Sequence, residues 1–420
     1  MTHLGLLCPA ETGHLNTMLP LGQEMQRRGH KVTFFGIADA QAKVLAAGLE
    51  FRSIGEAEFP IGSSELLFTE LGKLSGLAAI KYTLDWIESS AKIFLKDGPD
   101  ALKAAQIEAL LVDQIASEGG LVAEFLDIPY VTICSALPFN QEPAIPPLFT
   151  TWIYNPNWWA VLRNQLVYFL VNPFTKPMKK LRSSYRQAWQ LPPETSCDSQ
   201  LAIVTQQPAE FEFPRQNLPE NFHFTGPYHN KTSRKPVDFP WDKLTGKPLI
   251  YASMGTLQNQ LNDVFLAIAT ACVELDAQLV ISLGGASLEG LPALPGDPIV
   301  VSYAPQLALL ERASVAITHA GMNTALECLT YGVPMVAIPI TNDQPGVAAR
   351  IAWIGAGEIV PLNKLTAVKL ATALKLVLTK ESYRHNALRL KQSIAQAGGV
   401  SRAADIIELA ISTRQPVNQI

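Results

Sequence analysis

The sequence of 420 residues is poor in charged side chains. They make up 17% of it, against roughly 25% in typical soluble proteins, and the formal net charge is −4. A nucleic-acid-binding protein needs a basic face, so this mild acidity argues against a nucleic acid as partner. The chain is nevertheless 48% hydrophobic, which excludes a disordered protein and predicts a large core.

Metal-binding and disulfide-forming residues are also scarce. There are seven histidines and no C-x-x-C pair, so we expect neither a metal site nor a thiol redox site. The five cysteines are scattered and mostly lie in apolar runs, which is typical of reduced, buried thiols in a cytoplasmic protein. The N-terminus lacks the basic and apolar segments of a signal peptide, and no run reaches the 18 or so apolar residues of a membrane span.

Short apolar runs alternate with longer stretches of helical periodicity, a pattern typical of parallel βαβ units. The runs are almost continuously apolar, so we expect strands buried on both faces in an α/β fold with two Rossmann-like, doubly wound domains. The predicted strands are Leu4–Cys8, Lys31–Phe35, Leu110–Val112, Tyr130–Cys134, Leu201–Thr205, Leu249–Ser253, Gln278–Leu283, Ile299–Ser302, Val315–Thr318, Met335–Pro339 and Gly357–Val360.

A polar, proline-containing stretch without periodicity, residues 229–248, reads as the linker between the two halves. The predicted domains are therefore residues 1–228 and residues 249–398. Residues 399–420 are expected to form a C-terminal helix that packs back toward the N-terminal domain. Ligands of doubly wound sheets bind beyond the carboxyl ends of the strands, so we expect the site in the cleft that the two domains face.

Aromatic residues crowd the segment 138–177, which has many prolines and few charges. One interpretation is an inserted pair of helices that packs on the sheet, because aromatic side chains usually serve cores. The other is an apolar acceptor pocket or a surface that touches a membrane, and the two can coexist. Phe139, Trp152 and Trp158 are the candidate acceptor-binding residues.

The loop after the first predicted strand holds a single glycine, Gly13, where a dinucleotide-binding fold has G-x-G-x-x-G, so a nicotinamide dehydrogenase is disfavoured. His14 follows at the opening of a helix, where an imidazole can act as a general base. Asp113 ends another strand of the same sheet and can accept a hydrogen bond from His14. The alternatives are a helix start for His14 and a helix N-cap for Asp113, with Glu118 a weaker partner.

In the second half, small and polar residues gather at the start of a predicted helix. Gly321 allows a backbone to come close to a phosphate, and Asn323 and Thr324 open a helix whose free N–H groups favour an anion. His319 can donate a hydrogen bond to a diphosphate. Each of these residues, taken singly, also fits an ordinary packing role.

Neighbouring residues fit the rest of a sugar nucleotide. Glu327 lies one helical turn after Asn323 and can accept bonds from two ribose hydroxyls. Tyr303 can stack on a base. Asp343 and Gln344 offer acceptors and donors suited to sugar hydroxyls.

These residues together resemble the donor-binding signature of the UDP-glycosyltransferases, which have the GT-B fold. The signature reads W-x-P-Q, H-C-G-W-N-S, a glutamate and D/E-Q. It is matched here by Tyr303-Ala-Pro-Gln306, His319-Ala-Gly-Met-Asn-Thr324, Glu327 and Asp343-Gln344. Tyr303 stands for the usual tryptophan and keeps stacking possible. Ala320 and Met322 stand for Cys and Trp, as in many bacterial members of the family.

The resemblance extends over essentially the whole chain. Gly13-His14 resembles the G-H-x-x-P region that holds the family's catalytic base, although Pro20 comes later than in that pattern, and Asp113 aligns with the aspartate partner. Asn342–Arg350 is similar to bacterial zeaxanthin glucosyltransferases and macrolide glycosyltransferases. Ser253-Met-Gly-Thr256 resembles a turn that contacts the diphosphate. The resemblance implies donor-binding roles for Ser253, Thr256, Tyr303, Gln306, His319, Gly321, Asn323, Thr324, Glu327, Asp343 and Gln344.

The function that this resemblance implies is inverting transfer of a hexose from a UDP-sugar to a hydroxyl of a lipophilic small molecule, with His14 as base. Gln344 favours glucose. No D-x-D is present, so we expect neither a metal nor a resident cofactor. We expect a cytoplasmic monomer, with peripheral membrane contact left open. The alternatives are a UDP-sugar epimerase or hydrolase of the same fold, and a non-catalytic sugar-nucleotide-binding subunit.

Overall fold

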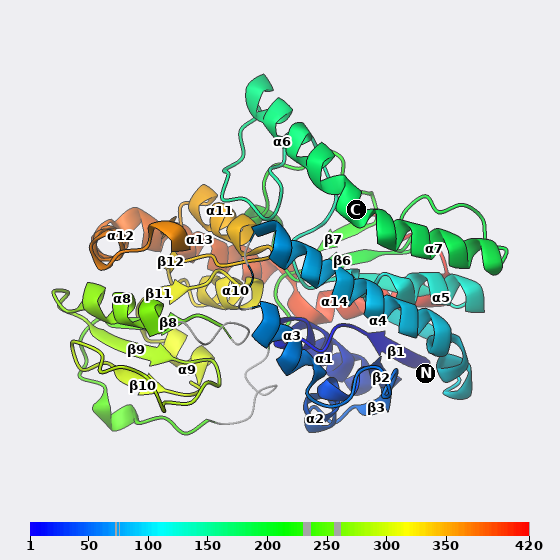
Figure 1. Cartoon of the computed structure of the whole chain (residues 1–420), viewed down its shortest axis with the longest axis horizontal. Helices are drawn as coiled ribbons and strands as arrows, with labels where there is room; N and C mark the ends of the chain where they lie inside the picture. The colour runs from blue at the N-terminus through cyan, green and yellow to red at the C-terminus, as the bar shows by residue number, and fades with distance from the viewer. Residues whose placement is uncertain (72–73, 75, 230–236, 256–261, 420) are drawn as a thin grey trace.

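The computed structural model describes residues 1–71, 74, 76–229, 237–255 and 262–419. They form two lobes, each built on one parallel sheet (Figure 1). The N-terminal sheet has seven strands in the order β3-β2-β1-β4-β5-β6-β7. Its strands are β1 (His3–Leu7), β2 (Lys31–Gly36), β3 (Glu50–Ser53), β4 (Ala109–Asp113), β5 (Tyr130–Cys134), β6 (Ile203–Thr205) and β7 (Phe222–Phe224).

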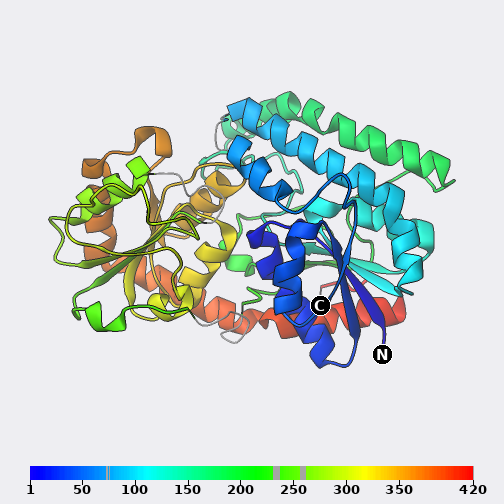
Figure 2. The same ribbon diagram turned by 60° about the horizontal axis from the view of Figure 1, so that its bottom comes forward.

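Helices cover both faces of the N-terminal sheet. Apolar side chains of α1 (Thr12–Arg27) and of the last helix, α14 (Gly399–Thr413), pack on one face. Those of α4 (Gly76–Ala104) and α5 (Glu118–Leu126) pack on the other. Figure 2 shows α14, in red, on the side of the sheet away from α4. The remaining helices of this lobe are α2 (Gln41–Ala46), α3 (Ser63–Leu71), α6 (Trp158–Val171) and α7 (Lys176–Ala188).

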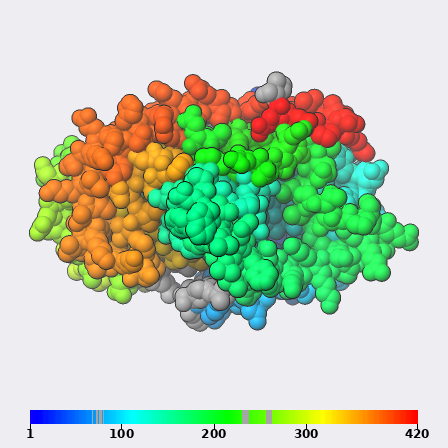
Figure 3. All heavy atoms as spheres, turned by 90° about the horizontal axis from the view of Figure 1, so that it is seen from above, coloured from blue at the N-terminus to red at the C-terminus, as the bar shows by residue number. Residues whose placement is uncertain are grey.

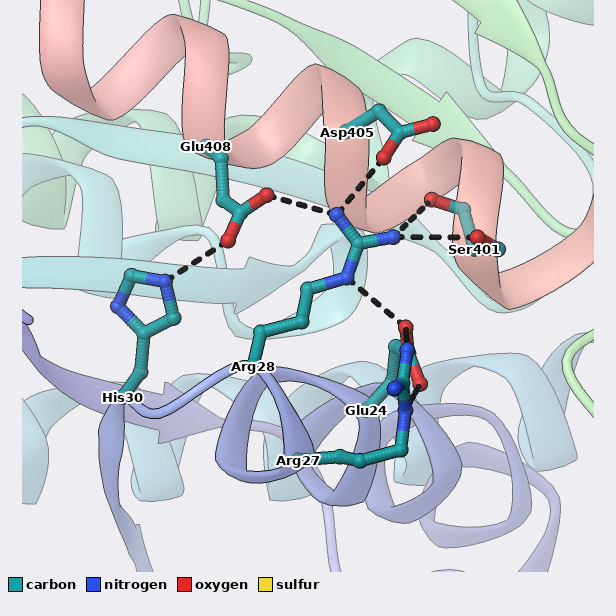
Figure 4. Close-up of polar contacts among 7 residues, drawn as sticks. All are labelled: Glu24, Arg27, Arg28, His30, Ser401, Asp405 and Glu408. Carbon is teal, nitrogen blue, oxygen red and sulfur yellow. Dashed lines mark hydrogen bonds and ion pairs between the residues drawn. The ribbon is translucent and has the colours of Figure 1, made fainter.

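Ion pairs fix α14 to the N-terminal lobe. The Arg28 guanidinium at the end of α1 lies 2.7 Å from a carboxylate oxygen of Asp405 and 2.7 Å from one of Glu408. His30 Nε2 is 3.0 Å from the other oxygen of Glu408 (Figure 4). The chain therefore returns from the C-terminal lobe to pack on the N-terminal one. The exact domain boundaries at 228, 248 and 398 stay a prediction.

The C-terminal sheet has six parallel strands in the order β10-β9-β8-β11-β12-β13. They are β8 (Leu249–Ser253), β9 (Gln278–Ser282), β10 (Ile299–Val301), β11 (Ala313–Thr318), β12 (Met335–Ala337) and β13 (Gly357–Ile359). One core of this lobe packs under α9, α10, α11 and α13, and the other under α8 and α12. These helices are α8 (Asn262–Cys272), α9 (Gln306–Leu310), α10 (Met322–Thr330), α11 (Gln344–Trp353), α12 (Ala367–Thr379) and α13 (Glu381–Ala397).

The predicted fold class is confirmed, and each of the eleven predicted strands overlaps a strand of one of the two sheets. Two edge strands were not predicted. In β3 exposed and half-buried residues alternate, so it lacks the continuous apolar run of a central strand. β7 has only three residues. Edge strands need little apolar sequence because a helix or solvent, rather than a second strand, lies on their outer side.

The aromatic segment, residues 138–177, contains α6 and the start of α7, the pair of helices that one of the two interpretations expected. Residues 138–157 run without a helix or strand up to α6. Leu181 and Tyr185 of α7 pack against the core beneath α5, whereas α6 leaves most of its apolar side chains exposed. In the described part of the chain, no helix is both long and apolar enough to cross a membrane.

Candidate active site

A cavity of about 930 Å³ lies between the two lobes, and residues of both line it. The loops that follow β1, β4 and β5 form one side, and the loops that follow β8, β11 and β12 form the other. The carboxyl ends of both parallel sheets therefore open onto the same space, where doubly wound folds bind ligands.

His14, in the first turn of α1, lines this cavity, and Asp113 lies behind it at the end of β4. Nδ1 of His14 is 2.9 Å from Oδ2 of Asp113, which is fully buried. The other carboxylate oxygen accepts a bond from the backbone N–H of Ile115 at 2.9 Å, so Asp113 also caps a 3-10 turn. Both interpretations of Asp113 thus hold at once.

Ser135, at the end of β5, is a third member of this group. Its hydroxyl lies 2.6 Å from Oδ2 of Asp113 and 2.7 Å from Nδ1 of His14. Glu118 also borders the cavity, but no hydrogen bond joins it to His14 in the described part of the chain. Ser135 belongs to none of the sequence motifs named above; besides the family resemblance, its place after the third neighbouring strand is the signal that points to it.

Charge around His14 favours the imidazolium form. Burial lowers the pKa of His14, but the charge and hydrogen bond of Asp113, with the charges of Glu11 and Asp343, outweigh it and raise this pKa to about 9. For the carboxyl group of Glu118, burial acts in the other direction and raises the pKa to about 7. A ligand in the cavity therefore meets an imidazole whose protonation changes in the mildly alkaline range.

Across the cavity, α10 begins at Met322, after its N-cap residue Gly321, and within the described residues no side chain caps its first N–H groups. Beneath this turn the His319 ring is packed so closely that a Cβ on Gly321 would come within 2.4 Å of Nε2, and one on Gly255 within 2.6 Å. Burial lowers the pKa of His319 to about 4, so the ring is neutral at neutral pH. The helix end offers free backbone donors to an anion.

Glu327 is held further along α10. It is almost fully buried and accepts a hydrogen bond from the amide of Gln306, whose Oε1 accepts one from the Tyr251 hydroxyl at 2.9 Å. Thr324 Oγ1 is 3.5 Å from the same amide nitrogen. The signature residues Gln306 and Glu327 thus form one network on the cavity wall, with the carboxylate fixed in place.

Asp343 and Gln344 also line the cavity, and hydrogen bonds to the backbone fix both side chains. Oδ2 of Asp343 accepts a bond from the backbone N–H of Leu137 in the N-terminal lobe at 3.3 Å. Oε1 of Gln344 accepts bonds from the N–H groups of Ile340 and Thr341, at 2.9 and 3.1 Å. With its oxygen engaged, the amide of Gln344 has its NH2 group left as a donor.

The remaining predicted residues divide into three groups. Ser253, Phe139 and the 45% exposed Tyr303 line the cavity. Thr256 lies outside the described residues. Trp152 and Trp158 do not line the cavity, contrary to expectation.

Both tryptophan side chains lie at the outer surface of the lobe. Trp152 packs under the Arg163 guanidinium, 3.7 Å from its ring centroid, and Trp158 is 77% exposed. A high density of aromatic residues in the sequence does not tell on which face of the segment each side chain lies. The apolar lining comes instead from residues that sequence reasoning missed or left unassigned: Phe59, Trp86, Phe149, Tyr168 and Phe174. In the described part of the chain, no three His, Cys, Asp or Glu side chains gather to hold a metal ion.

Comparison with protein families decides what the site belongs to. Residues 73–396 match the family model described as "UDP-glucoronosyl and UDP-glucosyl transferase". The chain belongs to this family. It is therefore a glycosyltransferase, and the signature residues around the cavity are those that carried the resemblance.

Relatives of similar length support this assignment. The chain is 30% identical to a zeaxanthin glucosyltransferase of Pantoea ananas, over 99% of this chain and 98% of the relative. It is 29% identical to the zeaxanthin glucosyltransferase of Pseudescherichia vulneris over the full length of both. Among solved structures, the glycotransferase of kitacinnamycin matches with a TM-score of 0.76 and 22% identity, over 98% of this chain and 99% of that one. These structural neighbours confirm the GT-B fold.

Proposed function

We propose that this glycosyltransferase moves a hexose, glucose by preference, from a UDP-sugar to a hydroxyl of a lipophilic small molecule, with inversion at the anomeric carbon. The observation that carries the proposal is the meeting of His14 with the N-terminus of α10. Nδ2 of Asn323, the second residue of that helix, lies 2.7 Å from the carbonyl oxygen of Gly13. A basic side chain and an anion-binding helix end thus border the same cavity.

The base in this scheme is His14. Its Nδ1–H donates to Asp113, so that in the neutral ring Nε2 carries the free lone pair. Nε2 takes the proton of the acceptor hydroxyl as that oxygen attacks the anomeric carbon. Asp113 holds the tautomer and stabilises the imidazolium that forms, and Ser135 adds a hydrogen bond to the same carboxylate.

The leaving group in this scheme is the UDP diphosphate, stabilised by the start of α10 and by the turn at Ser253. Backbone N–H groups at the helix end are fixed donors toward the charge that develops as the C1–oxygen bond breaks. The base and the groups that would bind the leaving diphosphate belong to different lobes, which suits a single in-line displacement. An α-linked donor would give a β-glycoside.

The choice of donor and acceptor is supported by the lining and by the relatives. Glu327 suits two ribose hydroxyls, Tyr303 the base, and the NH2 group of Gln344 a sugar hydroxyl. The N-terminal lobe lines the cavity with Phe59, Trp86 and other apolar side chains. Such a lining suits a carotenoid, terpenoid, flavonoid or polyketide, and two relatives are named for glucosylation of zeaxanthin. One chain supplies both walls, so we propose that a monomer is sufficient.

The test is transfer from UDP-glucose to a panel of lipophilic alcohols and phenols, followed by product mass and by the anomeric coupling constant in NMR. We expect β-glucosides, and His14→Ala should lower kcat by at least about 10²-fold. His385→Ala, an exposed histidine on α13, is the matched control and should be unchanged. Retention of the anomeric configuration, or near wild-type turnover by His14→Ala, would contradict the mechanism.

The two alternatives give different results in the same assay. An epimerase or hydrolase consumes UDP-glucose at full rate without any acceptor, and it has no use for the apolar end of the cavity. A non-catalytic subunit binds UDP but transfers to nothing in the panel. The His14–Asp113 hydrogen bond favours an active enzyme, because a binding subunit needs no oriented base.

A further inference from the structure

Helix α6 carries an exposed apolar stripe along its whole length. Trp158, Leu162, Leu166 and Leu170 follow one another at intervals of four residues, and each is more than half exposed. Phe169, beside the stripe, is 74% exposed. In Figure 1 the helix projects from the N-terminal lobe, and Figure 3 looks down on the face that it forms. We call these five residues the α6 face.

Two polar side chains of α6, Asn164 and Tyr168, turn inward, although Gln165 is exposed; the apolar stripe faces outward, which reverses the usual pattern of a surface helix. Asn164 is buried and donates to the carbonyl of Pro143 at 3.2 Å. The Tyr168 hydroxyl donates to the carbonyl of Ile145 at 3.0 Å. Arg163 lies over the Trp152 ring. Polar groups thus anchor the helix to the lobe, and the apolar side chains of the α6 face are exposed to water. A contiguous exposed apolar patch of this kind marks an interaction site.

Positive charge adjoins this face. No Asp or Glu occurs between Glu142 and Glu194, although the whole chain has a net charge of −4. Lys176, Lys179 and Lys180, at the start of α7, are exposed, and none of them forms an ion pair within the described residues. The deeper basic residues of α7 differ, because Arg182 and Arg186 are buried and paired with glutamates. The three lysines therefore remain available to an anionic partner.

The inner side of the same segment lines the active-site cavity. Tyr168 and Val171 of α6, and Asn172 and Phe174 just after it, border the cavity, as does the half-exposed Phe139. The α6 face and part of the cavity lining thus belong to the same helix and the residues that follow it.

We propose that the α6 face and the three lysines dock this protein on the surface of an anionic lipid bilayer. Aromatic and leucine side chains next to lysines are the composition that binds the interface of such membranes. A second copy of the chain is a poorer occupant, because a symmetric contact would bring two sets of unpaired lysines together. Where the acceptor is lipophilic, as the proposed function has it, docking would place the cavity beside the phase in which that acceptor dissolves.

Docking is tested by co-sedimentation of the full chain with vesicles of phosphatidylcholine alone and of phosphatidylcholine mixed with phosphatidylglycerol. We expect binding to the mixed vesicles, weakened by salt, and little binding to the neutral ones. Leu166→Ser/Phe169→Ser and Lys179→Glu/Lys180→Glu should each lower the partition coefficient at least about 10-fold. All four side chains are exposed and none borders the cavity, so the thermal midpoint and turnover of a water-soluble acceptor should stay unchanged.

Matched controls come from α12 on the other lobe. Val368→Ser replaces a side chain that is 76% exposed, and Lys369→Glu/Lys375→Glu reverses two exposed charges. These variants should bind vesicles like the wild type. Equal partition of the control and α6-face variants, or no sedimentation with anionic vesicles, would overturn the proposal. So would a concentration-dependent dimer in analytical ultracentrifugation that Phe169→Ser abolishes. The vesicle assay needs no turnover, so its outcome is independent of the proposed reaction.

Discussion

The side-chain amide of Asn323 donates a hydrogen bond to the carbonyl oxygen of Gly13, 2.7 Å away, and so joins the two lobes one residue before His14. Gly13 belongs to the first turn of α1, and Asn323 to the first turn of α10. This hydrogen bond therefore holds the first turns of the two helices next to each other across the cavity. This contact gives Asn323 a task in domain placement besides any contact with a donor.

Replacing Asn323 should uncouple these two helix starts. Asn323→Ala removes the donor, and Asn323→Asp in addition places a carboxylate oxygen against a carbonyl oxygen. We expect kcat/KM to fall about 10-fold for Ala, the usual effect of a lost hydrogen bond, and further for Asp. Steady-state kinetics together with calorimetric titration of UDP measure it. Unchanged kinetics in both variants would remove Asn323 from the proposed arrangement.

The pH dependence of turnover should report His14. The pKa of its imidazole is raised to about 9, and a base must be unprotonated, so kcat/KM should rise with pH and level off above about 9. Asp113→Asn removes the charge that raises this pKa. The rise should therefore move to lower pH while the plateau falls, by up to about 10⁴-fold if the tautomer is lost. Initial rates from pH 6 to 10 give both quantities, and a flat profile would contradict the assignment of the base.

The sequence predicts the site residues that lie in or directly after regular helices and strands, because the periodicity of apolar residues locates those elements. His14 and Asp113 each follow an apolar run, and parallel strands bring such positions to one edge of the sheet. The spacing of His319, Glu327 and Gln344 likewise placed them together on one cavity wall. Trp152 and Trp158 lie in an irregular segment and at a helix start, where no period fixes the direction of a side chain. Long-range partners such as Gly13 and Asn323 leave no local signal at all.

A buried ion pair between the lobes should dominate the stability of the domain interface. The Arg350 guanidinium of α11 binds the carboxylate of Glu212 in the N-terminal half, with Nε 2.9 Å from Oε1, and both side chains are buried. Glu212→Gln leaves a buried guanidinium without its counter-charge, which typically costs about 3–5 kcal/mol. Urea denaturation measures the free energy of unfolding. Asp276→Asn, which breaks the exposed pair with Lys247, is the control and should leave the free energy of unfolding nearly unchanged.

The last prediction concerns the ion pairs that hold α14. A control lies one residue away from Arg28, at Arg27. Arg28 is mostly buried and binds Glu24 in its own helix and Asp405 and Glu408 in α14 (Figure 4). Arg27 is 70% exposed, and among the described residues its one ion-pair partner is Glu24. Arg28→Ala should therefore destabilise the docking of α14 by about 1.5–3 kcal/mol, the range for a hydrogen bond to a charged group.

Arg27→Ala should cost far less, because an ion pair between exposed side chains of one helix adds little to stability. Hydrogen exchange resolves the two effects, because amides of α14 should lose protection in Arg28→Ala while those of the C-terminal sheet keep it. Equal protection of α14 in both variants would mean that its apolar contacts alone, through Ala403, Ile407 and their neighbours, hold it in place. The two arginines thus separate the contribution of charge from that of packing at the point where the chain returns to its first domain.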